Sequence, residues 1–354
     1  MKLAIMAVTK GGLATAKEIA DSYSDEVDIF ISDKLGKQID DLEGINQYSG
    51  RLKGLVEDIF DQYDGLIFVM ALGIVVRVIA GILDDKRSDP AVITIDETKE
   101  FVISTLSGHL GGANELAVSI ANLINAKPVV TTATDCQNKL AIDMVAKKLN
   151  CEIEPFSNLT RINAAIVNDK EVNIFTDYEL DLELTDNMKL YPLTKLGEVS
   201  KVATVIISNQ QLNLPAEIKK TSYLWLKPRN LVVGIGCRRG ISKDKIEKAV
   251  RTALTKIDKN LRQVRFLATI DLKANEEGLL EYAKENEFNL NIISREEIKA
   301  TDLEFTTSEF VKKIIGVGGV CEPVALLSGK RMELLLKKQK LQGVTVAIAE
   351  ERFM

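Results

Sequence analysis

Short apolar runs alternate, over the first 150 residues, with segments whose apolar side chains recur every three to four positions. Such runs predict buried strands, and the helical spacing predicts amphipathic helices. The expected strands lie near Leu3–Val8, Val27–Ile31, Leu66–Met70, Ala91–Ile95, Phe101–Leu106 and Val129–Thr132. The expected helices lie near Leu13–Asp21, Leu52–Asp61, Ile74–Leu83, Ala113–Ile124 and Leu140–Leu149. This alternation is typical of α/β domains built on a parallel sheet.

The pattern loosens between residues 151 and 229. It predicts a short helix at Leu159–Val167 and strands at Val172–Phe175 and Thr204–Ser208. The acidic, weakly patterned stretch Asp177–Asp186 indicates an exposed connection. Trp225–Asn230 has the composition of a linker. We therefore expect a small α/β middle segment that ends in a linker.

A third pattern begins at residue 230. The expected strands are Leu231–Gly236, Val264–Ile270, Leu290–Ile293 and two closing strands, with helices at Ser242–Ile257, from about Gly278 and near Val324–Leu327. Ser242 is the expected N-cap of the first helix. The fold class is therefore α/β throughout. We predict an N-terminal Rossmann-like parallel-sheet domain (1–150), the middle segment (151–229) and a separate C-terminal α/β domain (230–354).

Composition narrows the class of protein. Apolar residues make up 46% and charged residues 27%, the balance of a soluble globular protein. The net charge of −5 argues against general nucleic-acid binding but leaves room for a local basic pocket. Four scattered cysteines indicate neither a disulfide framework nor a zinc cluster, so a cytoplasmic location is expected. No stretch approaches the roughly 20 apolar residues that cross a bilayer, and no signal peptide is evident, so no membrane association is expected.

His109 is the single histidine of the chain, which excludes metal sites that need two histidines. It lies in the run Ser107-Gly108-His109-Leu110-Gly111-Gly112-Ala113-Asn114-Glu115, between an expected strand and an expected helix. Glycine-rich strand-to-helix loops are where α/β proteins present reactive groups and bind anions. The alternative is a loop histidine that only hydrogen-bonds to the backbone. The flanking glycines, Asn114 and Glu115 leave both interpretations open.

Three polar segments follow expected strands of the N-terminal domain. The first combines Ala71–Arg77 with the charged loop Asp84–Pro90, the second is the His109 loop, and the third is Thr131–Asp135. In open α/β sheets, ligands bind beyond the carboxyl ends of the strands. We therefore expect the three segments to line one cleft. For the charged loop, an ordinary solvated surface is the alternative.

A fourth segment, Gly234-Ile235-Gly236-Cys237-Arg238-Arg239-Gly240, comes near the dinucleotide-binding fingerprint without matching it. Its two arginines suit a ligand rich in carboxylates. Ala268–Lys273 and Gly316–Glu322 also end strands or fill glycine turns, for which tight turns with ordinary caps are the alternative. Neither a G-x-S-x-G nucleophile elbow nor a Walker A sequence is present.

These blocks resemble, in order and over nearly the whole chain, the cobalt-precorrin-5A hydrolases of the anaerobic cobalamin pathway. The blocks that carry the resemblance are Met70–Arg77, Asp85–Val92, Leu106–Glu115, Thr131–Asp135, Val233–Gly240, Leu267–Ala274 and Gly316–Pro323. The middle section carries no recognised motif. Asn275 stands where the family pattern has an aspartate, and Ile241-Ser242 replaces Thr-Ser or Thr-Pro. Position 275 is therefore assigned no role.

The resemblance implies a reaction. The family opens the δ-lactone that joins the ring A acetate to C20 of a cobalt-containing corrinoid, and releases C20 with its methyl group as acetaldehyde, giving cobalt-precorrin-5B. Cobalt travels with the substrate, so no separate cofactor is expected. His109 is the leading candidate base, with Glu115 as an alternative or as its orienting partner. The backbone N–H groups of Gly111 and Gly112 are candidate oxyanion donors.

The corrinoid carries many acetate and propionate carboxylates, which need counter-charges. The basic residues expected to supply them are Arg77, Lys86, Arg87, Arg238, Arg239 and Lys273. The other expected substrate-binding residues are Ser107, Gly108, Gly111, Gly112, Asn114, Thr134, Asp135, Thr269, Asp271 and Glu322.

Two other classes of function remain open. One is a non-catalytic tetrapyrrole carrier that hands a labile intermediate to neighbouring enzymes of the pathway. The other is a dinucleotide-dependent enzyme built on the Gly234–Gly240 loop. The order of lactone opening and carbon–carbon cleavage is also open, and a homodimer is compatible with the sequence.

Overall fold

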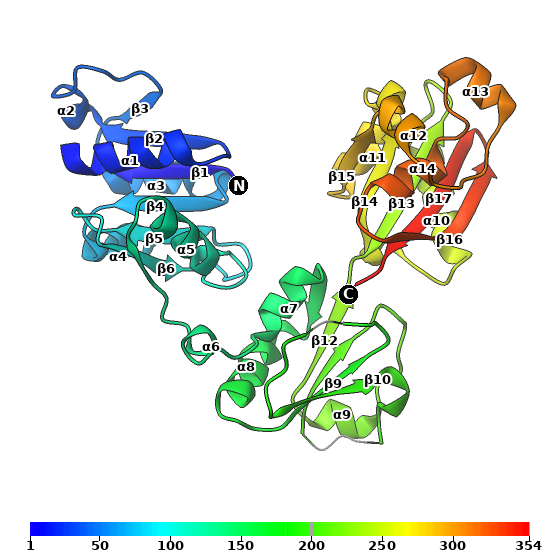
Figure 1. Ribbon diagram of the computed structural model, residues 1–354, viewed down its shortest axis with the longest axis horizontal. Helices are drawn as coiled ribbons and strands as arrows, with labels where there is room; N and C mark the ends of the chain where they lie inside the picture. The colour runs from blue at the N-terminus through cyan, green and yellow to red at the C-terminus, as the bar shows by residue number, and fades with distance from the viewer. Residues whose placement is uncertain (181, 199–201, 354) are drawn as a thin grey trace. The chain divides into compact units, whose positions relative to one another are not determined.

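Three β-sheets with packed helices form the described part of the chain, residues 1–180, 182–198 and 202–353, in this computed structural model (Figure 1). Clustering of the chain divides it into an N-terminal unit, Met1–Met144, and a C-terminal unit, Val145–Met354. The N-terminal unit holds one sheet and the C-terminal unit holds two. The predicted α/β class is confirmed.

The sheet of the N-terminal unit has seven strands in the order β3-β2-β1-β4-β5-β6-β7. The strands are β1 (Leu3–Ala7), β2 (Val27–Ser32), β3 (Ile45–Tyr48), β4 (Gly65–Val69), β5 (Ala91–Ile95), β6 (Phe101–Leu106) and β7 (Lys127–Val129). Neighbours are parallel except for β5 and β6. β3 was not predicted, and β7 shares only Val129 with the strand expected at Val129–Thr132.

Helices cover both faces of this sheet. They are α1 (Lys10–Ser22), α2 (Asp33–Gly36), α3 (Leu52–Ile59), α4 (Leu72–Ile79), α5 (Ala113–Leu123) and α6 (Ala133–Cys136), with α7 (Ile142–Lys148) crossing the boundary of the unit. Successive side chains of a strand point to opposite faces. Leu3 and Ile5 therefore join the core layer under α1 and α5, whereas Ala4 and Met6 join the layer under α3 and α4.

The antiparallel β5–β6 pair decides where the candidate segments lie. Val92 pairs with Leu106 and Ile95 with Val102, so β6 ends at the edge where β5 begins. β7 runs parallel to β6 and ends at that same edge. The carboxyl end of β4, which leads into Ala71–Arg77, lies at the opposite edge. The expectation that all three polar segments meet at one sheet edge is therefore wrong for Ala71–Arg77.

The first sheet of the C-terminal unit has the order β10-β9-β11-β12-β8, with only β8 antiparallel to its neighbour. Its strands are β8 (Cys151–Glu154), β9 (Val172–Thr176), β10 (Met188–Pro192), β11 (Ala203–Ile207) and β12 (Tyr223–Pro228); its helices are α8 (Leu159–Val167) and α9 (Ala216–Lys220). The linker predicted at Trp225–Asn230 is wrong for its first four residues. They belong to β12, where Leu224 and Leu226 are fully buried and alternate with half-buried residues.

The second sheet has the order β15-β14-β13-β17-β16. Its strands are β13 (Leu231–Cys237), β14 (Val264–Ile270), β15 (Asn289–Ile293), β16 (Met332–Leu341) and β17 (Val344–Glu351); its helices are α10 (Lys243–Thr255), α11 (Glu277–Glu285), α12 (Arg295–Ala300), α13 (Glu309–Ile315) and α14 (Cys321–Leu327). β13, β14 and β15 are parallel, and β17 returns antiparallel to β13. Ser242 is the N-cap residue of α10, as predicted, although its side chain makes no capping hydrogen bond.

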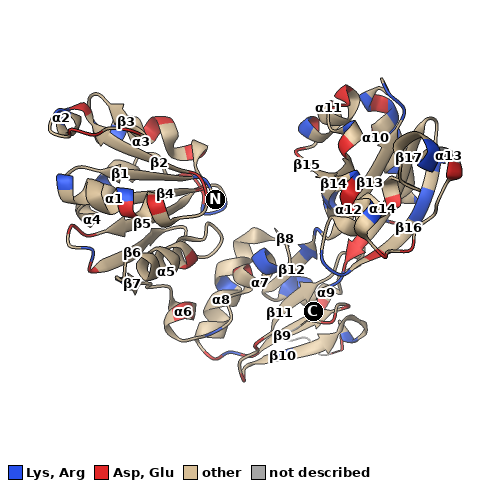
Figure 2. Ribbon diagram, turned by 45° about the horizontal axis from the view of Figure 1, so that its top comes forward, with Lys and Arg blue, Asp and Glu red and all other residues tan. Residues whose placement is uncertain are grey.

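The surface and the connections agree with the composition. Acidic and basic residues are interspersed over both units (Figure 2). The described residues of the acidic connection at Asp177–Asp186 form neither helix nor strand and are exposed or half-buried; residue 181 lies outside the description. Among the described helices, none has the length and apolar character that a membrane span requires.

Candidate functional site

The His109 loop connects β6 to α5 by a tight turn. Ser107 has a φ of 56° and Gly112 a φ of 89°, both in the left-handed region. A non-glycine residue there stores strain, which proteins retain mostly where the surrounding structure and function require it. Gly111 lies so close to Ser107 that a Cβ on Gly111 would come within 2.4 Å of the Ser107 Cβ. The loop therefore needs glycine at position 111, and it presents His109 beside the start of α5.

Two carboxylates hold the His109 ring. Nδ1 lies 3.0 Å from Asp143 Oδ2, and Nε2 lies 2.7 Å from Asp135 Oδ2. The hydrogen bond to Asp143 is the main reason that the pKa of His109 is raised from 6.5 to about 9, with Asp135 adding to it against the opposing effect of burial. The imidazole side chain is only 13% exposed. At neutral pH His109 is therefore a cation that donates to both carboxylates.

Asp135, on α6, accepts several hydrogen bonds through one oxygen. Its Oδ2 accepts from His109, from Thr132 Oγ1 at 2.5 Å and from Asn114 Nδ2 at 3.2 Å. Burial alone would raise the pKa of Asp135, but the hydrogen bonds from Thr132 and His109 hold it below the ordinary value. None of these three bonds uses Oδ1, and the side chain is 42% exposed. Asp135 is thus a fixed carboxylate with one oxygen turned away from its protein donors.

Buried polar side chains support Asp135 and His109 from behind. Asn114 is 7% exposed, accepts from Ser104 Oγ at 2.6 Å and donates to Thr132 Oγ1 at 2.8 Å. Thr134 is 4% exposed, and its Oγ1 lies 3.2 Å from His109 Nε2. Such a network fixes the positions of its members because every buried polar atom would lose a partner on movement. Asn114 and Thr134, which we predicted to bind substrate, therefore position Asp135 and His109.

The start of α5 offers fewer free backbone donors than the sequence suggested. The N–H of Gly112 donates to the His109 carbonyl at 3.1 Å, and the N–H groups of Ala113 and Asn114 donate to the carbonyls of Ser107 and Gly108. The predicted oxyanion role of Gly112 is therefore wrong for this conformation. Within the described residues, the Gly111 N–H has no such acceptor.

The other predicted residues of the N-terminal unit divide between the two sheet edges. Arg77 lies on α4, at the edge opposite His109, and donates to the Gly73 carbonyl. The loop that contains Lys86 and Arg87 leads into β5 on the His109 side, where the Asp89 carbonyl approaches Gly111. Arg87 pairs with Asp85 at 2.8 Å.

Two further predicted residues of this unit lie in the His109 loop and at the start of the helix that follows it. Glu115 is exposed on the first turn of α5. The hydroxyl oxygen of Ser107 is buried and has no hydrogen-bond partner among the described residues.

In the C-terminal unit, the residues predicted to bind substrate differ in solvent exposure. Arg238 and Arg239 are exposed just past the end of β13, and Lys273 follows the end of the parallel strand β14, where it pairs with Glu276 at 2.9 Å. Thr269 and Glu322 are 0% and 1% exposed. Their side chains are therefore not available to a ligand in this conformation.

The two buried side chains form hydrogen bonds, and Asp271 an ion pair, with other residues of the same chain. Thr269 donates to the Ile235 carbonyl, while Glu322 accepts from the backbone N–H groups of Thr306 and Lys338 and from the Thr306 hydroxyl. Asp271 pairs with Arg295 at 3.0 Å.

Sequence reasoning missed Asp143 and Thr132. Asp143 lies 34 residues beyond His109 in the chain, on the first turn of α7, and is 6% exposed. In a sequence, an acidic residue at the start of a helix is ordinarily explained by its favourable position in the first turn. Nothing in the sequence therefore indicated that Asp143 contacts His109. Thr132 lies within the polar segment Thr131–Asp135, and its position three residues before Asp135 was the available signal.

The arrangement of these side chains is suited to holding a water molecule and accepting its proton. Among the described residues no cluster of His, Cys, Asp and Glu has the arrangement of a metal site. Asp135 presents a carboxylate oxygen to solvent, His109 fixes the charge of that carboxylate, and the Gly111 N–H is a nearby donor. A water-activating carboxylate beside an oriented cation is suited to hydrolysis.

Comparison with known proteins covers nearly the whole chain. Three family models match in order: Cobalamin synthesis G N-terminal at residues 54–135, Cobalamin biosynthesis central region at 140–228, and Cobalamin synthesis G C-terminus at 231–349. A cobalt-precorrin-5A hydrolase from Priestia megaterium is 33% identical over 98% of this chain and 94% of its own length. One from Salmonella typhimurium is 33% identical over 98% and 97%. A crystal structure of a cobalamin biosynthesis protein G homolog from Sulfolobus solfataricus is 23% identical, covers 99% of this chain and 97% of its own, and has a TM-score of 0.40.

Proposed function

Because the chain belongs to the cobalamin synthesis G family, we infer that it is a cobalt-precorrin-5A hydrolase. The observation that carries this function is the 33% identity to enzymes of that name along nearly the full length of both chains. The substrate is a cobalt corrinoid. Water opens its δ-lactone, and the two-carbon unit of C20 and its methyl group leaves as acetaldehyde.

We propose Asp135 as the carboxylate that activates water. Oδ2 is held by Thr132, Asn114 and His109, which leaves Oδ1 to accept a proton from water as the water oxygen attacks the lactone carbonyl carbon. The acyl–oxygen bond then breaks, and the proton held by Asp135 passes to the leaving C20 oxygen. This gives a hydroxyl on C20 and an acid on the ring A acetate, which loses its proton to solvent. Asp135, ionised again, removes the C20 hydroxyl proton to give the carbonyl of acetaldehyde, while the electron pair of the broken carbon–carbon bond remains with the macrocycle.

His109 takes a different role from the base that its sequence context suggested. A group whose pKa is raised to about 9 is protonated at neutral pH and has no lone pair to accept a proton. We propose that the cation orients Asp135, keeps it ionised and lowers the energy of negative charge that develops nearby. The Gly111 N–H is the proposed backbone donor to the oxyanion. Lys86 and Arg87 are the proposed contacts of this unit to substrate carboxylates, and cobalt enters with the substrate.

The test is an anaerobic incubation of the full chain with cobalt-precorrin-5A, following acetaldehyde and product mass together. Stoichiometric acetaldehyde with the matching loss of mass is the expected result. Lactone opening without acetaldehyde would limit the chain to the first step. If the macrocycle binds and is recovered unchanged, the protein is a carrier and the hydrolase function is wrong.

A further inference from the structure

A basic cavity lies within the C-terminal unit, and none of its lining residues is among those that the sequence analysis predicted to bind substrate. Its volume is about 690 Å³, inside the range of small-molecule sites. Four segments line it: the end of α7 and the residues after it (148–150), the start of β14 (265 and 266), the end of α14 with the turn that follows (327–331), and the end of β17 with the two residues after it (351–353). The turn and the chain end are joined, because the Lys330 N–H donates to Glu351 Oε1.

The lining carries far more positive than negative charge. Its ionisable side chains are Lys148, Arg265, Lys330, Arg331, Arg352 and one acid, Glu351. Glu351 pairs with Arg265, and Arg352 pairs with Glu333 and Glu350 outside the cavity. In the described part of the chain, Lys148, Lys330 and Arg331 have no carboxylate partner. Three uncompensated cations in one cavity of a protein with net charge −5 favour an anionic ligand.

The walls between these cations are apolar and fixed. Phe266 and Phe353 are half-buried; the Phe353 ring packs edge-on against Tyr178 at 5.3 Å between centroids, and the Arg265 guanidinium lies over Phe266. Arg331 has a φ of 52°, and its carbonyl accepts from the Arg352 N–H at 3.2 Å. The turn therefore fixes the backbone that carries Lys330 and Arg331 before a ligand arrives, which reduces the entropy lost on binding.

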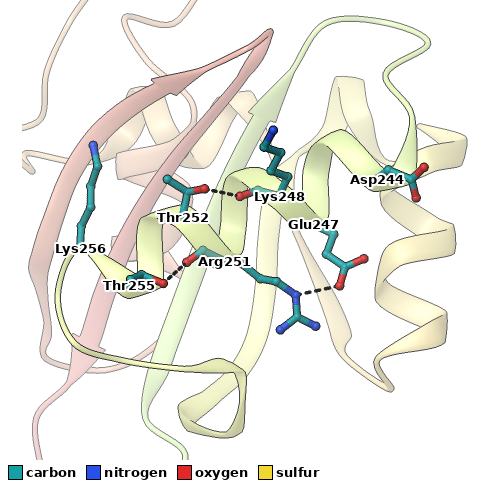
Figure 3. A pocket seen from close by; sticks show the side chains of 7 residues that line it. All are labelled: Asp244, Glu247, Lys248, Arg251, Thr252, Thr255 and Lys256. Atoms are coloured by element: carbon teal, nitrogen blue, oxygen red, sulfur yellow. Dashed lines mark hydrogen bonds and ion pairs between the residues drawn. The ribbon is translucent and has the colours of Figure 1, made fainter.

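A second depression of similar volume shows that volume alone does not identify a site. It measures about 730 Å³ and runs along α10, whose side chains line it together with Lys256 just after the helix (Figure 3). Thr252 and Thr255 donate to carbonyls of the same helix, and Arg251 pairs with Glu247 at 2.8 Å. Lys256 donates to Gln339 on β16, so the bonds of these four lining residues stay within the protein, and nearly the whole wall comes from one helix.

We propose that the cavity lined by residues 148–150, 265–266, 327–331 and 351–353 binds a polycarboxylate corrinoid, with Lys148, Lys330 and Arg331 as contacts to its peripheral carboxylates. This proposal rests on the proposed function for the identity of the ligand. The phenylalanine rings and the apolar wall match the ring system of a corrinoid, and the cations match its side chains. The C-terminal unit thus provides a binding site of its own.

The probe is cobyrinic acid, a stable corrinoid that retains its carboxylates, titrated into the full chain by calorimetry. The test variant is Lys330→Gln with Arg331→Asn, because asparagine tolerates the left-handed backbone at position 331. The control is Lys219→Gln with Lys220→Gln, which removes the same charge from exposed positions of α9. We expect Kd to rise by about tenfold or more in the test variant and to stay within about twofold in the control. A corrinoid with neutral amide side chains should bind weakly to all three proteins.

The outcomes separate this proposal from the proposed function. Equal Kd values for the test variant and the natural chain, or no binding of cobyrinic acid by the natural chain, would overturn the cavity assignment while leaving turnover untouched. Charge-dependent binding without any turnover of cobalt-precorrin-5A would support the cavity and overturn the hydrolase.

Discussion

The His109 site and the basic cavity treat positive charge in opposite ways. In the N-terminal unit one cation lies between two carboxylates of the protein itself, at 3.0 and 2.7 Å. In the C-terminal unit Lys148, Lys330 and Arg331 have no carboxylate partner among the described residues. A charge neutralised within the protein stabilises one arrangement of its neighbours, whereas an uncompensated charge is available to a ligand. We therefore expect changes at the first site to alter chemistry and stability, and changes at the second to alter binding.

The largest expected effect is the loss of turnover in Asp135→Asn. An amide cannot accept the proton of the attacking water, so kcat should fall by about 10²- to 10⁴-fold. Acetaldehyde release measures the change, with Asp40→Asn as a control at an exposed carboxylate of the same unit. If the variant kept more than about a third of the natural kcat, another group would have to activate water. The His109 site would then not be the site of chemistry in this comparison.

The second prediction concerns pH. The folded pKa of His109, about 9, is above the unfolded value near 6.5, so its pairing with Asp143 and Asp135 stabilises the fold fully below pH 6.5. That stabilisation, about 3 kcal/mol at most, is lost as pH rises through 9. Urea unfolding of the natural chain and of His109→Gln at pH 6.5 and 9.5 measures it, since other titrating groups cancel between the two proteins. Parallel pH profiles would show that the two carboxylates do not hold a cation.

The sequence predicted features formed by neighbouring residues better than features formed by residues far apart in the chain. The strands Ala91–Ile95 and Phe101–Leu106 were predicted to the residue, because buried strands produce continuous apolar runs. β3, β8 and β10 were missed, since these edge strands are short and largely polar or exposed.

The sequence does indicate the antiparallel direction of β6, although we predicted a parallel sheet. Only Asp96–Glu100 separates β5 from β6, which is too short for a parallel crossover and favours a hairpin. The Asp143–His109 pair and the basic cavity could not be predicted from the sequence, because residues from distant segments form both and no local pattern links those segments.

Glu322 tests the comparison inside the C-terminal unit. It is a charge that the protein neutralises, with hydrogen bonds from Thr306 and Lys338 that hold its pKa below the ordinary value against the effect of burial. Glu322→Gln should lower the free energy of unfolding by about 1–3 kcal/mol, because the amide NH₂ would face these donors. Urea unfolding measures the loss, with the exposed Glu309→Gln as control. Unchanged stability together with weaker corrinoid binding would make Glu322 a ligand contact, as the sequence suggested.

The smallest expected effect is at Glu115, the alternative base of the sequence analysis. Its side chain is exposed on the first turn of α5, and both ring nitrogens of His109 are already held by Asp135 and Asp143. Glu115→Gln should therefore change kcat by less than about threefold, far below the effect of a proton-transfer group. Acetaldehyde release by this variant and by Asp135→Asn, at equal substrate concentration, makes the comparison direct. A loss at Glu115 as large as at Asp135 would mean that the proton-accepting carboxylate lies on α5, and that the hydrogen-bonded cluster around His109 serves only to shape the loop.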